Sequence, residues 1–370
     1  MFGRRGQISQ YTAGVEFLLL GALLNSGLII DQPHELFEGL RPFVHLELAW
    51  IGMLYGIQYE WRKLKREPLG DFWLVGMEGF STIILVFFCS MFIIPFHGVP
   101  AGQSLIPAAV MLAAGASISS PWTLSMVLSV QKSKLNLTRR LQLIAILDDI
   151  PGFLVFVILF FSCCNSFSEA VLKFAGGTFT GISIGIIVMY QLRGRIEEFE
   201  PLLVLIGSAL LAAGISLALG IPVIYVTLVS GLVIANTLPR NRDIFPVLAG
   251  SEHLLYLLFL LIAGAFWNPT DIFALGLAVI LIIIRYFSKW SSFQISRRFI
   301  SIPGWSGKLA STLISPGGLA VAMVMNIMLF PERFLMAQLV LDVTVWTLII
   351  LSPVGLPLAR RAILKLEAEQ

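Results

Sequence analysis

The chain has 370 residues, of which 57% are hydrophobic and only 13% are charged, and its formal net charge is +3. With a mean hydropathy of +0.88, this composition lies far outside the range of soluble domains, so we expect an all-α integral membrane protein. Its three cysteines, Cys89, Cys163 and Cys164, provide neither a disulfide framework nor the spacing of metal ligands.

Twelve apolar segments follow one another along the chain, and we expect each to cross the bilayer as a helix. About 17 to 25 residues are enough for a helix to span a hydrocarbon core of ~30 Å. The predicted segments cover residues 11–30, 43–60, 72–96, 104–130, 141–163, 170–192, 201–219, 221–237, 253–267, 271–290, 306–329 and 334–357.

The distribution of Lys and Arg predicts the orientation, because cytoplasmic connections carry the excess of these residues. With the N-terminus inside, only Arg41, Lys173 and Arg333 fall on the outer side, and the even number of segments places both termini in the cytoplasm. We therefore expect a multi-pass protein of the inner (plasma) membrane. The basic clusters reflect this topology and do not indicate a nucleic-acid partner.

The connections between the segments are short, and we expect no cleavable signal peptide and no soluble regulatory domain. The longest connection, residues 290–306, is predicted to lie on the inner membrane surface as an amphipathic segment, just after an interfacial Lys289. The sequence pairs no nucleophile with a base and clusters no metal ligands, so we expect neither an enzyme nor a bound cofactor.

The fourth and the eleventh segments each contain a Ser-Pro step within apolar sequence. These steps are Ser120-Pro121, which follows Ser119, and Ser315-Pro316. Proline removes a backbone donor and clashes with the preceding turn, so we expect both helices to be discontinuous at these positions.

An offset of 195 residues aligns Pro121 with Pro316 and brings Asp148 and Asp149 within two residues of Asp342. The third to fifth segments therefore resemble the tenth to twelfth. Because the fourth segment runs inward and the eleventh runs outward, the sequence predicts an inverted repeat, an arrangement typical of secondary transporters.

Asp148 and Asp149 lie side by side in the otherwise apolar fifth segment. One acid at the centre of a transmembrane helix costs roughly 2.5 to 3.5 kcal/mol, and two ionised neighbours repel each other. Asp149 lies about eight residues into the segment, or ~12 Å, which is close to the midplane and to the level of both breaks. The pair is therefore the candidate site for a proton or a monovalent metal cation.

Pro151 adds a candidate ligand, because it leaves the carbonyl of Leu147 without its normal helical donor. Adjacent residues of a helix point about 100° apart, so the two acids must face different neighbours.

Arg285, in the apolar part of the tenth segment, is the expected counter-charge of the acids; alternatively, it extends toward the inner boundary. Asp342 is expected to be buried, where it caps a half-helix or pairs with Arg285. Glu78 in the third segment is a weaker candidate, as are Glu16 and Glu47 in the first two segments.

In the order and spacing of its motifs the chain resembles the monovalent cation:proton antiporter superfamily, which contains the sodium/proton exchangers and their potassium-coupled relatives. The resemblance covers nearly the whole chain and rests on Ala116-Ser-Ile-Ser-Ser-Pro-Trp-Thr123, Leu147-Asp-Asp149, Val229-Ser-Gly-Leu-Val-Ile-Ala-Asn236 and Ser315-Pro-Gly-Gly-Leu-Ala320.

The resemblance implies that the fourth and eleventh helices cross at their interruptions, beside a fifth helix that carries the ion-binding aspartate. By position, Asp149 would bind either cation or proton, and Asp148 would pair with Arg285. The resemblance also implies a core bundle, approximately 72–163 and 271–357, that slides against dimer-forming scaffold helices, approximately 11–60 and 201–267. Two adjacent acids are the pattern of electrogenic members.

The chain departs from the family pattern at the fourth-segment break, where many relatives carry an acid before the proline and this chain has Ser120. The expected function is thus a homodimeric antiporter that exchanges Na⁺, or alternatively K⁺, for protons by alternating access. Two other functions stay open. A potassium efflux system gated by partners predicts a nucleotide-binding domain or subunit, and an organic-anion/sodium symporter leaves the paired acids unexplained.

Overall fold

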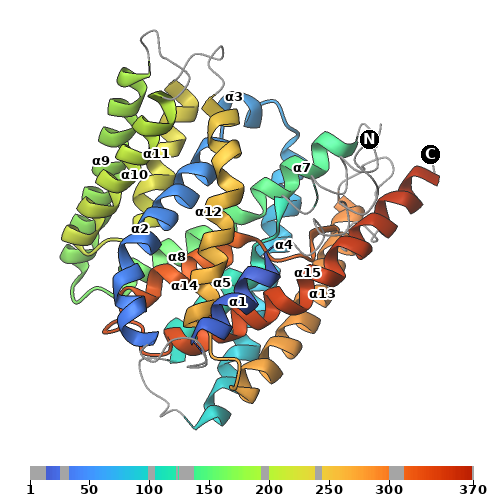
Figure 1. The fold of residues 1–370 in the computed structure, drawn as a ribbon. Helices are drawn as coiled ribbons and strands as arrows, with labels where there is room; N and C mark the ends of the chain where they lie inside the picture. The colour runs from blue at the N-terminus through green and yellow to red at the C-terminus, as the bar shows by residue number, and fades with distance from the viewer. Residues whose placement is uncertain are drawn as a thin grey trace, which may run out of the picture.

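The structure, a computed structural model, describes residues 14–25, 33–98, 105–121, 124, 137–192, 200–237, 244–299 and 312–368. Within these ranges the regular elements are helices, and the only paired extended backbone is an isolated bridge between Ser119 and Pro316 (Figure 1). The prediction of an all-helical chain is therefore confirmed for the described residues.

Each of the twelve predicted segments contains a described helix. The elements in chain order are α1 (Val15–Asn25), α2 (Pro33–Gln58), α3 (Trp61–Leu64), α4 (Leu69–Ile93), η1 (Ile94–His97), α5 (Leu105–Ser117), α7 (Leu137–Leu147), α8 (Asp149–Ser162), α9 (Phe167–Gln191), α10 (Glu200–Leu219), α11 (Val223–Thr237), α12 (Ile244–Phe266), α13 (Ile272–Phe299), α14 (Gly318–Met328) and α15 (Ala337–Ala368).

Helix length and hydropathy support a multi-pass membrane protein. Within the described ranges, six stretches are long and apolar enough to cross a bilayer: Leu69–His97, Leu141–Ser162, Phe167–Gln191, Pro201–Leu219, Ile272–Ser296 and Ala337–Leu364. Shorter apolar helices, including α1, α5, α11 and α14, accompany them.

Four helices extend well beyond their predicted bounds. α12 begins at Ile244 instead of residue 253. α2 begins at Pro33 instead of residue 43, and α15 continues to Ala368 through two internal prolines. α13 continues to Phe299, so residues 290–299 prolong a spanning helix where a separate surface segment was expected. The helix continues because Ser292 and Phe293 are buried against neighbouring helices. Residues 300–306 of the expected segment lie outside the described ranges.

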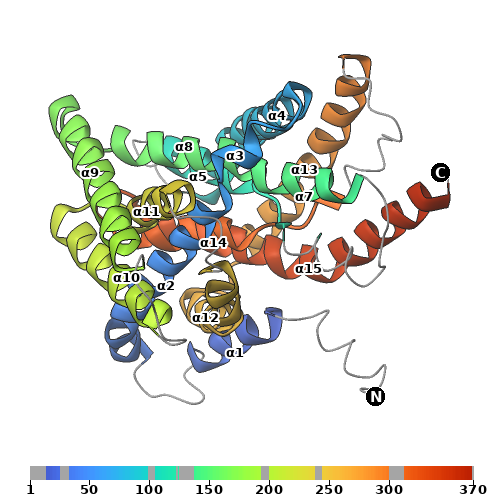
Figure 2. The ribbon, with the colours of Figure 1, turned by 90° about the horizontal axis from the view of Figure 1, so that it is seen from above.

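One group of helices packs through close backbone contacts. α1 lies against α12, α2 lies against α11, and α9 lies beside α11 (Figure 2). The helices approach closely where glycine removes the side chain: a Cβ at Gly231 of α11 would overlap the carbonyl oxygen of Met53 in α2. We call α1, α2, α9, α11 and α12 the glycine-packed group.

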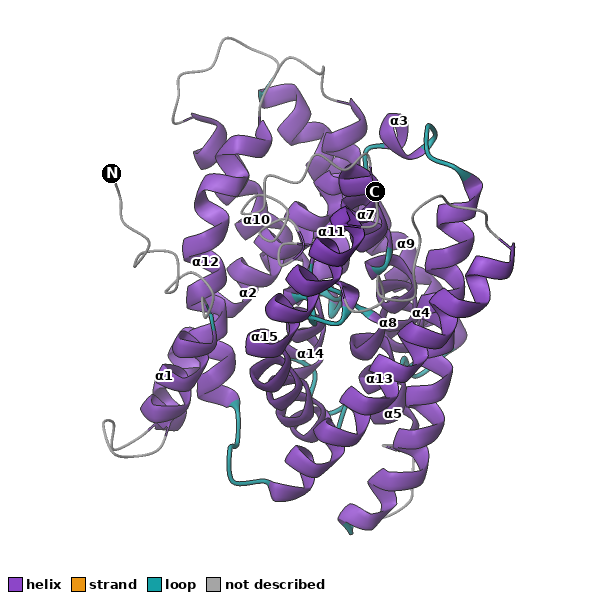
Figure 3. Ribbon diagram, turned by 90° about the vertical axis from the view of Figure 1, so that its right-hand side faces the viewer, coloured by secondary structure: helices purple, strands orange, loops and turns teal. Residues whose placement is uncertain are grey.

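A second group contains α4, α5, α8, α13 and α15. α4 packs against both α5 and α13, α5 packs against α8, and α13 packs against α15. Non-helical backbone, drawn in teal in Figure 3, lies in the interior among α8, α14 and α15. Such backbone carries unpaired polar groups, so it requires polar partners at this depth.

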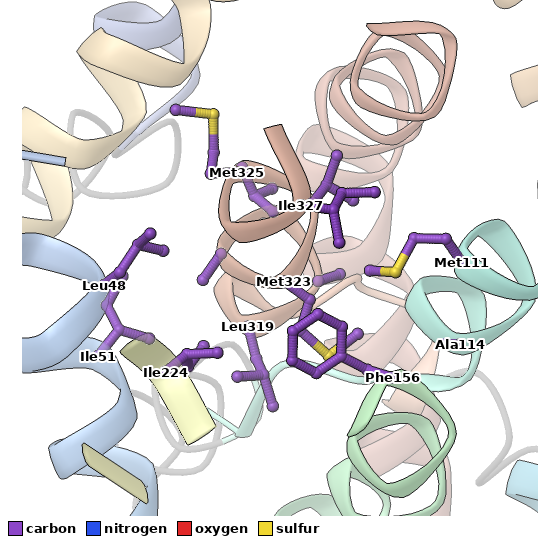
Figure 4. Close-up of a cluster of buried hydrophobic side chains, with 14 of the residues drawn as sticks. Leu48, Ile51, Met111, Ala114, Phe156, Ile224, Leu319, Met323, Met325 and Ile327 are labelled. Atoms are coloured by element: carbon purple, nitrogen blue, oxygen red, sulfur yellow. The ribbon is translucent and has the colours of Figure 1, made fainter. Parts of the chain in front are cut away.

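α14 is enclosed on all sides, because its residues from Leu319 to Ile327 are all buried. Figure 4 shows side chains around it from α2 (Leu48), α5 (Met111) and α8 (Phe156). α14 also contacts α11 and α15. This apolar helix therefore packs against members of both groups, and the non-helical backbone that precedes it is held in the interior.

Candidate functional site

Both predicted breaks are non-helical, and they contact each other. α5 ends at Ser117, four residues before Pro121, and α14 begins at Gly318, two residues after Pro316. Ser119 and Pro316 form the antiparallel bridge, and the backbone N–H of Ser120 donates to the carbonyl of Ser315 at 2.9 Å. The opposite halves of the two segments, in residues 122–123, 125–136 and 300–311, lie outside the described ranges.

Glycines allow the surrounding backbone to approach these breaks. A Cβ at Gly317 would lie 2.6 Å from the carbonyl oxygen of Ser119, and a Cβ at Gly152 of α8 would lie 2.6 Å from that of Ala114 in α5. Real Cβ atoms do not approach a carbonyl oxygen this closely, so a larger residue would push the elements apart. The glycines thereby bring the start of α8, with its aspartate, against the end of α5.

The paired aspartates lie where the fifth segment is interrupted. α7 ends at Leu147 and α8 begins at Asp149, with Asp148 between them. Pro151 lies just after this interruption and has no N–H to donate to the carbonyl of Leu147. Both aspartate side chains are fully buried, with relative exposures of 0%. The sequence therefore places two acids at a helix interruption inside the protein.

Arg285 binds the backbone of both breaks. Its guanidinium donates to the carbonyls of Ala116 and Ile118 at the end of α5, the latter at 2.7 Å, and to the carbonyl of Ile314 at 3.1 Å. It also lies 3.5 Å from the carbonyl of Ser315. The last carbonyls of a helix have no intrahelical donors and carry partial negative charge, so an arginine satisfies them well.

This geometry corrects two expectations for Arg285. Its side chain is 1% exposed, so it does not extend toward the membrane boundary. Its hydrogen bonds go to break carbonyls and to Ser119 Oγ, at 3.4 Å, and it forms no ion pair with Asp148 or with Asp342. The five donors of a guanidinium fit several divergent carbonyls, which explains why an arginine serves this position.

Lys289 is the basic partner of Asp148. Its Nζ lies 2.9 Å from Asp148 Oδ2 and also forms an ion pair with Glu78. It further donates to Ser119 Oγ at 2.9 Å and to the carbonyl of Ser117 at 3.3 Å. The expectation of an interfacial lysine is therefore wrong: Lys289 is 1% exposed because α13 continues past it as a packed helix.

Asp148 and Asp149 differ sharply in their surroundings. Asp148 accepts from Lys289 and from the hydroxyl of Ser119 through one carboxylate oxygen. Neither carboxylate oxygen of Asp149 has a hydrogen-bond partner within the described part of the chain. A buried carboxyl without partners is costly when it is ionised, so Asp149 is suited to take up a proton or a cation.

Glu78 enters the cluster from α4, where it is 1% exposed. A seam of hydroxyls between α4 and α13 fixes the alignment that brings it to Lys289. Ser81 Oγ lies 2.7 Å from Ser292 Oγ, and Thr82 Oγ1 lies 3.0 Å from Ser288 Oγ. Ser81 and Thr82, three and four residues after Glu78, therefore lie against Ser292 and Ser288, which flank Lys289. Residues three or four apart share one face of a helix.

The cluster leaves out Asp342. This residue accepts from the backbone N–H of Asn268 at 2.9 Å and from Gln338 Nε2 at 3.0 Å, so its partners lie on α15 and just after α12. It is buried, as expected, but it pairs with neither Arg285 nor Lys289. The offset of 195 residues aligned Asp342 with the aspartate pair. In the structure its hydrogen-bond partners are instead the uncharged groups of Asn268 and Gln338.

The cluster's formal charge follows from its five ionisable members. Glu78, Asp148 and Asp149 bring three negative charges when ionised, and Arg285 and Lys289 bring two positive charges. The sum is −1, so one proton or one monovalent cation neutralises the site. All five residues are at most 1% exposed, and water therefore contributes little to this balance.

Sequence reasoning underrated Lys289 and Glu78. Lys289 stands four residues after Arg285, so both lie on one face of α13, and this spacing was the signal for Lys289. For Glu78 the signal was the hydroxyl pair Ser81 and Thr82 on its own helical face. The sequence alone does not show how α4 aligns with α13, because this contact joins segments far apart in the chain.

No protein-family model matches the chain, and no curated protein matches it in sequence. Among solved structures, the chain is similar to that of the sodium proton antiporter MjNhaP1 from Methanocaldococcus jannaschii at pH 8, with a TM-score of 0.64 and 18% sequence identity. The match covers 92% of this chain and 91% of that chain. At this identity the similarity establishes the fold alone.

Proposed function

We propose that the chain is a secondary-active antiporter that exchanges a monovalent cation for protons, with cation and proton competing for Asp149. The carrying observation is that Asp149 is fully buried, has no hydrogen-bond partner among the described residues and lies beside the Asp148–Lys289 ion pair. The fold shared with a sodium proton antiporter supports this assignment and membership of the same superfamily.

The cluster's charge supports a monovalent substrate. With all five ionisable groups charged, the site has a formal charge of −1, which one monovalent cation or one proton cancels. A divalent cation would leave a buried positive charge, which is strongly unfavourable at low dielectric. The bound cation competes with Lys289 for Asp148 and with the proton for Asp149, and Leu147 and the hydroxyls of Ser119, Ser120 and Ser315 provide further candidate oxygens.

The remaining features of the proposal follow from the family resemblance. We infer exchange by alternating access in a homodimer of the inner (plasma) membrane, with both termini in the cytoplasm and with the second helix group moving against the scaffold. Exchange is proposed to be electrogenic, because two adjacent acids are typical of electrogenic members. Na⁺ is the proposed substrate; K⁺ is the alternative, since Ser120 brings no third acid to the break.

The decisive test is the loss of exchange in Asp149→Asn. In everted membrane vesicles, the wild type is expected to dissipate a proton gradient when Na⁺ is added, which is seen as dequenching of a pH-sensitive dye. Asp149→Asn is expected to show no response, because its amide does not titrate. Undiminished exchange would rule the proposal out.

Asp342→Asn is the matched control, since Asp342 is a buried aspartate outside the cluster whose amide analogue keeps an acceptor oxygen for Asn268. It is expected to exchange as the wild type does. In proteoliposomes, comparison of Na⁺, K⁺ and Li⁺ with and without an imposed voltage then tests substrate and electrogenicity together.

A further inference from the structure

Lys289 is shared by two carboxylates that come from different helices. Asp148, between α7 and α8, lies 2.9 Å from its ammonium, and Glu78 of α4 forms the second ion pair. Neither side chain is exposed by more than 2%. A single ammonium thus has two charged acceptors, of which only Asp148 belongs to the proposed cation-binding pair.

Cation binding requires this ammonium to move. A cation at Asp148 takes over the carboxylate that Lys289 contacts, and its positive charge repels the ammonium. A buried ammonium that loses its only charged partner is strongly destabilised. Without a second acceptor, the displaced Lys289 would therefore oppose cation binding at every cycle.

We propose that Glu78 is a positioning residue that holds the Lys289 ammonium when a cation displaces it from Asp148. This inference rests on the proposed function. In the cation-free state Lys289 bridges the two carboxylates, and in the cation-bound state it stays on Glu78. Glu78 lowers the free energy required to release Asp148 and thereby raises the apparent affinity for the cation, while touching neither cation nor transported proton.

The surroundings of Glu78 suit a fixed acceptor. Ser81 and Thr82, on the same helix, hydrogen-bond to Ser288 and Ser292 of α13, on either side of Lys289. α4 and α13 are therefore held in one alignment, and Lys289 can shift between acceptors through its flexible side chain without any movement of its helix. Ser117, whose carbonyl lies 3.3 Å from Nζ, provides a neutral contact in addition.

The test separates apparent affinity from maximal rate in proteoliposomes. Glu78→Gln is expected to raise the KM for Na⁺ by about tenfold or more with a smaller change in maximal rate, since the defect lies in binding. Asp342→Asn is the control, because Asp342 is a buried acid whose partners, Asn268 and Gln338, lie outside the cluster; its KM is expected to stay within about twofold of the wild type.

Rescue distinguishes positioning from a general role of Glu78 in packing. The double variant that combines Glu78→Gln with Lys289→Gln has no ammonium to release, so its KM is expected to return to within about threefold of the wild type. A packing defect would persist in the double variant. If Glu78→Gln is not recovered as folded protein, Glu78→Asp replaces it: the shortened acid is expected to raise the KM, and addition of Lys289→Gln to restore it.

Two results overturn the inference. One is an unchanged KM in the variant of Glu78, and the other is a double variant that binds as weakly as the single one. Failure of the proposed function has a different signature, because the wild type itself would then show no cation-driven proton movement. A wild type that exchanges normally, together with either overturning result, refutes the role of Glu78 alone.

Discussion

The two helix groups differ in what accompanies their close backbone contacts. In the glycine-packed group, backbones touch: a Cβ at Gly21 of α1 would overlap the carbonyl oxygen of Leu261 in α12, and a Cβ at Gly264 of α12 would overlap that of Leu18 in α1. In the second group, the contacts around the breaks are made by buried charges and by orphan carbonyls.

The difference bears on which part of the molecule can switch. Backbone contacts through small residues have one close-packed arrangement, and any displacement loses packing. Charged groups with several acceptors have more than one satisfied arrangement, as the shared ammonium of Lys289 illustrates. The glycine-packed group is therefore suited to a static role, and the polar cluster is suited to rearrangement when an ion binds.

The largest loss of stability is expected for Arg285→Ala, which tests the polar contacts of the second group. The substitution leaves the carbonyls of Ala116, Ile118 and Ile314 without their donor inside the protein, and each unsatisfied buried carbonyl costs about 1–3 kcal/mol. We expect a loss of about 3–5 kcal/mol in the free energy of unfolding, together with loss of exchange. Thermal unfolding of the purified protein in detergent measures the first quantity.

Arg285→Lys serves as the control for Arg285→Ala. It keeps the charge but reaches fewer carbonyls, so an intermediate loss is expected. A fully stable Arg285→Ala variant would show that the breaks do not depend on this side chain.

A smaller effect is expected for Gly231→Ala, which tests the glycine-packed group. The added Cβ would overlap the carbonyl oxygen of Met53 and lie 3.0 Å from the Cα of Gly56, so α2 and α11 must separate. Overpacking of this kind costs about 1–3 kcal/mol. We expect a lowered unfolding temperature, whereas the KM for Na⁺ of the folded protein stays unchanged.

The matched control for Gly231→Ala is Gly214→Ala in α10, where an added Cβ would meet no atom within 4 Å. It is expected not to lower the stability, and to raise it by up to about 1 kcal/mol, because alanine favours a helix more than glycine does. If Gly231→Ala altered the KM instead of the stability, the two groups would not differ in the way described.

The contrast also explains which features were predictable. The helices follow from apolar length, the breaks follow from Pro121 and Pro316, and the buried acids follow from the energetic penalty of carboxylates in an apolar segment. Each of these depends on local sequence, and the structure confirms the helices and the non-helical breaks. The roles of Asp148 and Asp149 in transport stay predictions.

The partners of these groups were not predictable in the same way. Arg285 and Lys289 are both basic residues on one face of α13, and only the packing of α13 against α4 and α5 decides which of them reaches Asp148. The boundary of α13 was misplaced for a related reason: a lysine followed by a tryptophan is typical of a membrane interface, but burial of the following turns extends the helix to Phe299.

The smallest effect is expected for Ser288→Ala, which weakens the hydroxyl seam. Ser288 Oγ lies 3.1 Å from Ser81 Oγ and 3.0 Å from Thr82 Oγ1, so its removal leaves the hydroxyl seam with the contact between Ser81 and Ser292. Hydrogen bonds between membrane helices contribute about 0.6 kcal/mol on average, and we expect a loss of roughly 0.5–1.5 kcal/mol. Ser291→Ala is the control, because its hydroxyl donates to a carbonyl of its own helix.

Since the seam aligns Glu78 with Lys289, Ser288→Ala should also raise the KM for Na⁺ by about two- to threefold, in the direction expected for Glu78→Gln but more weakly. Equal behaviour of Ser288→Ala and Ser291→Ala in unfolding and exchange would show that the seam does not set this alignment.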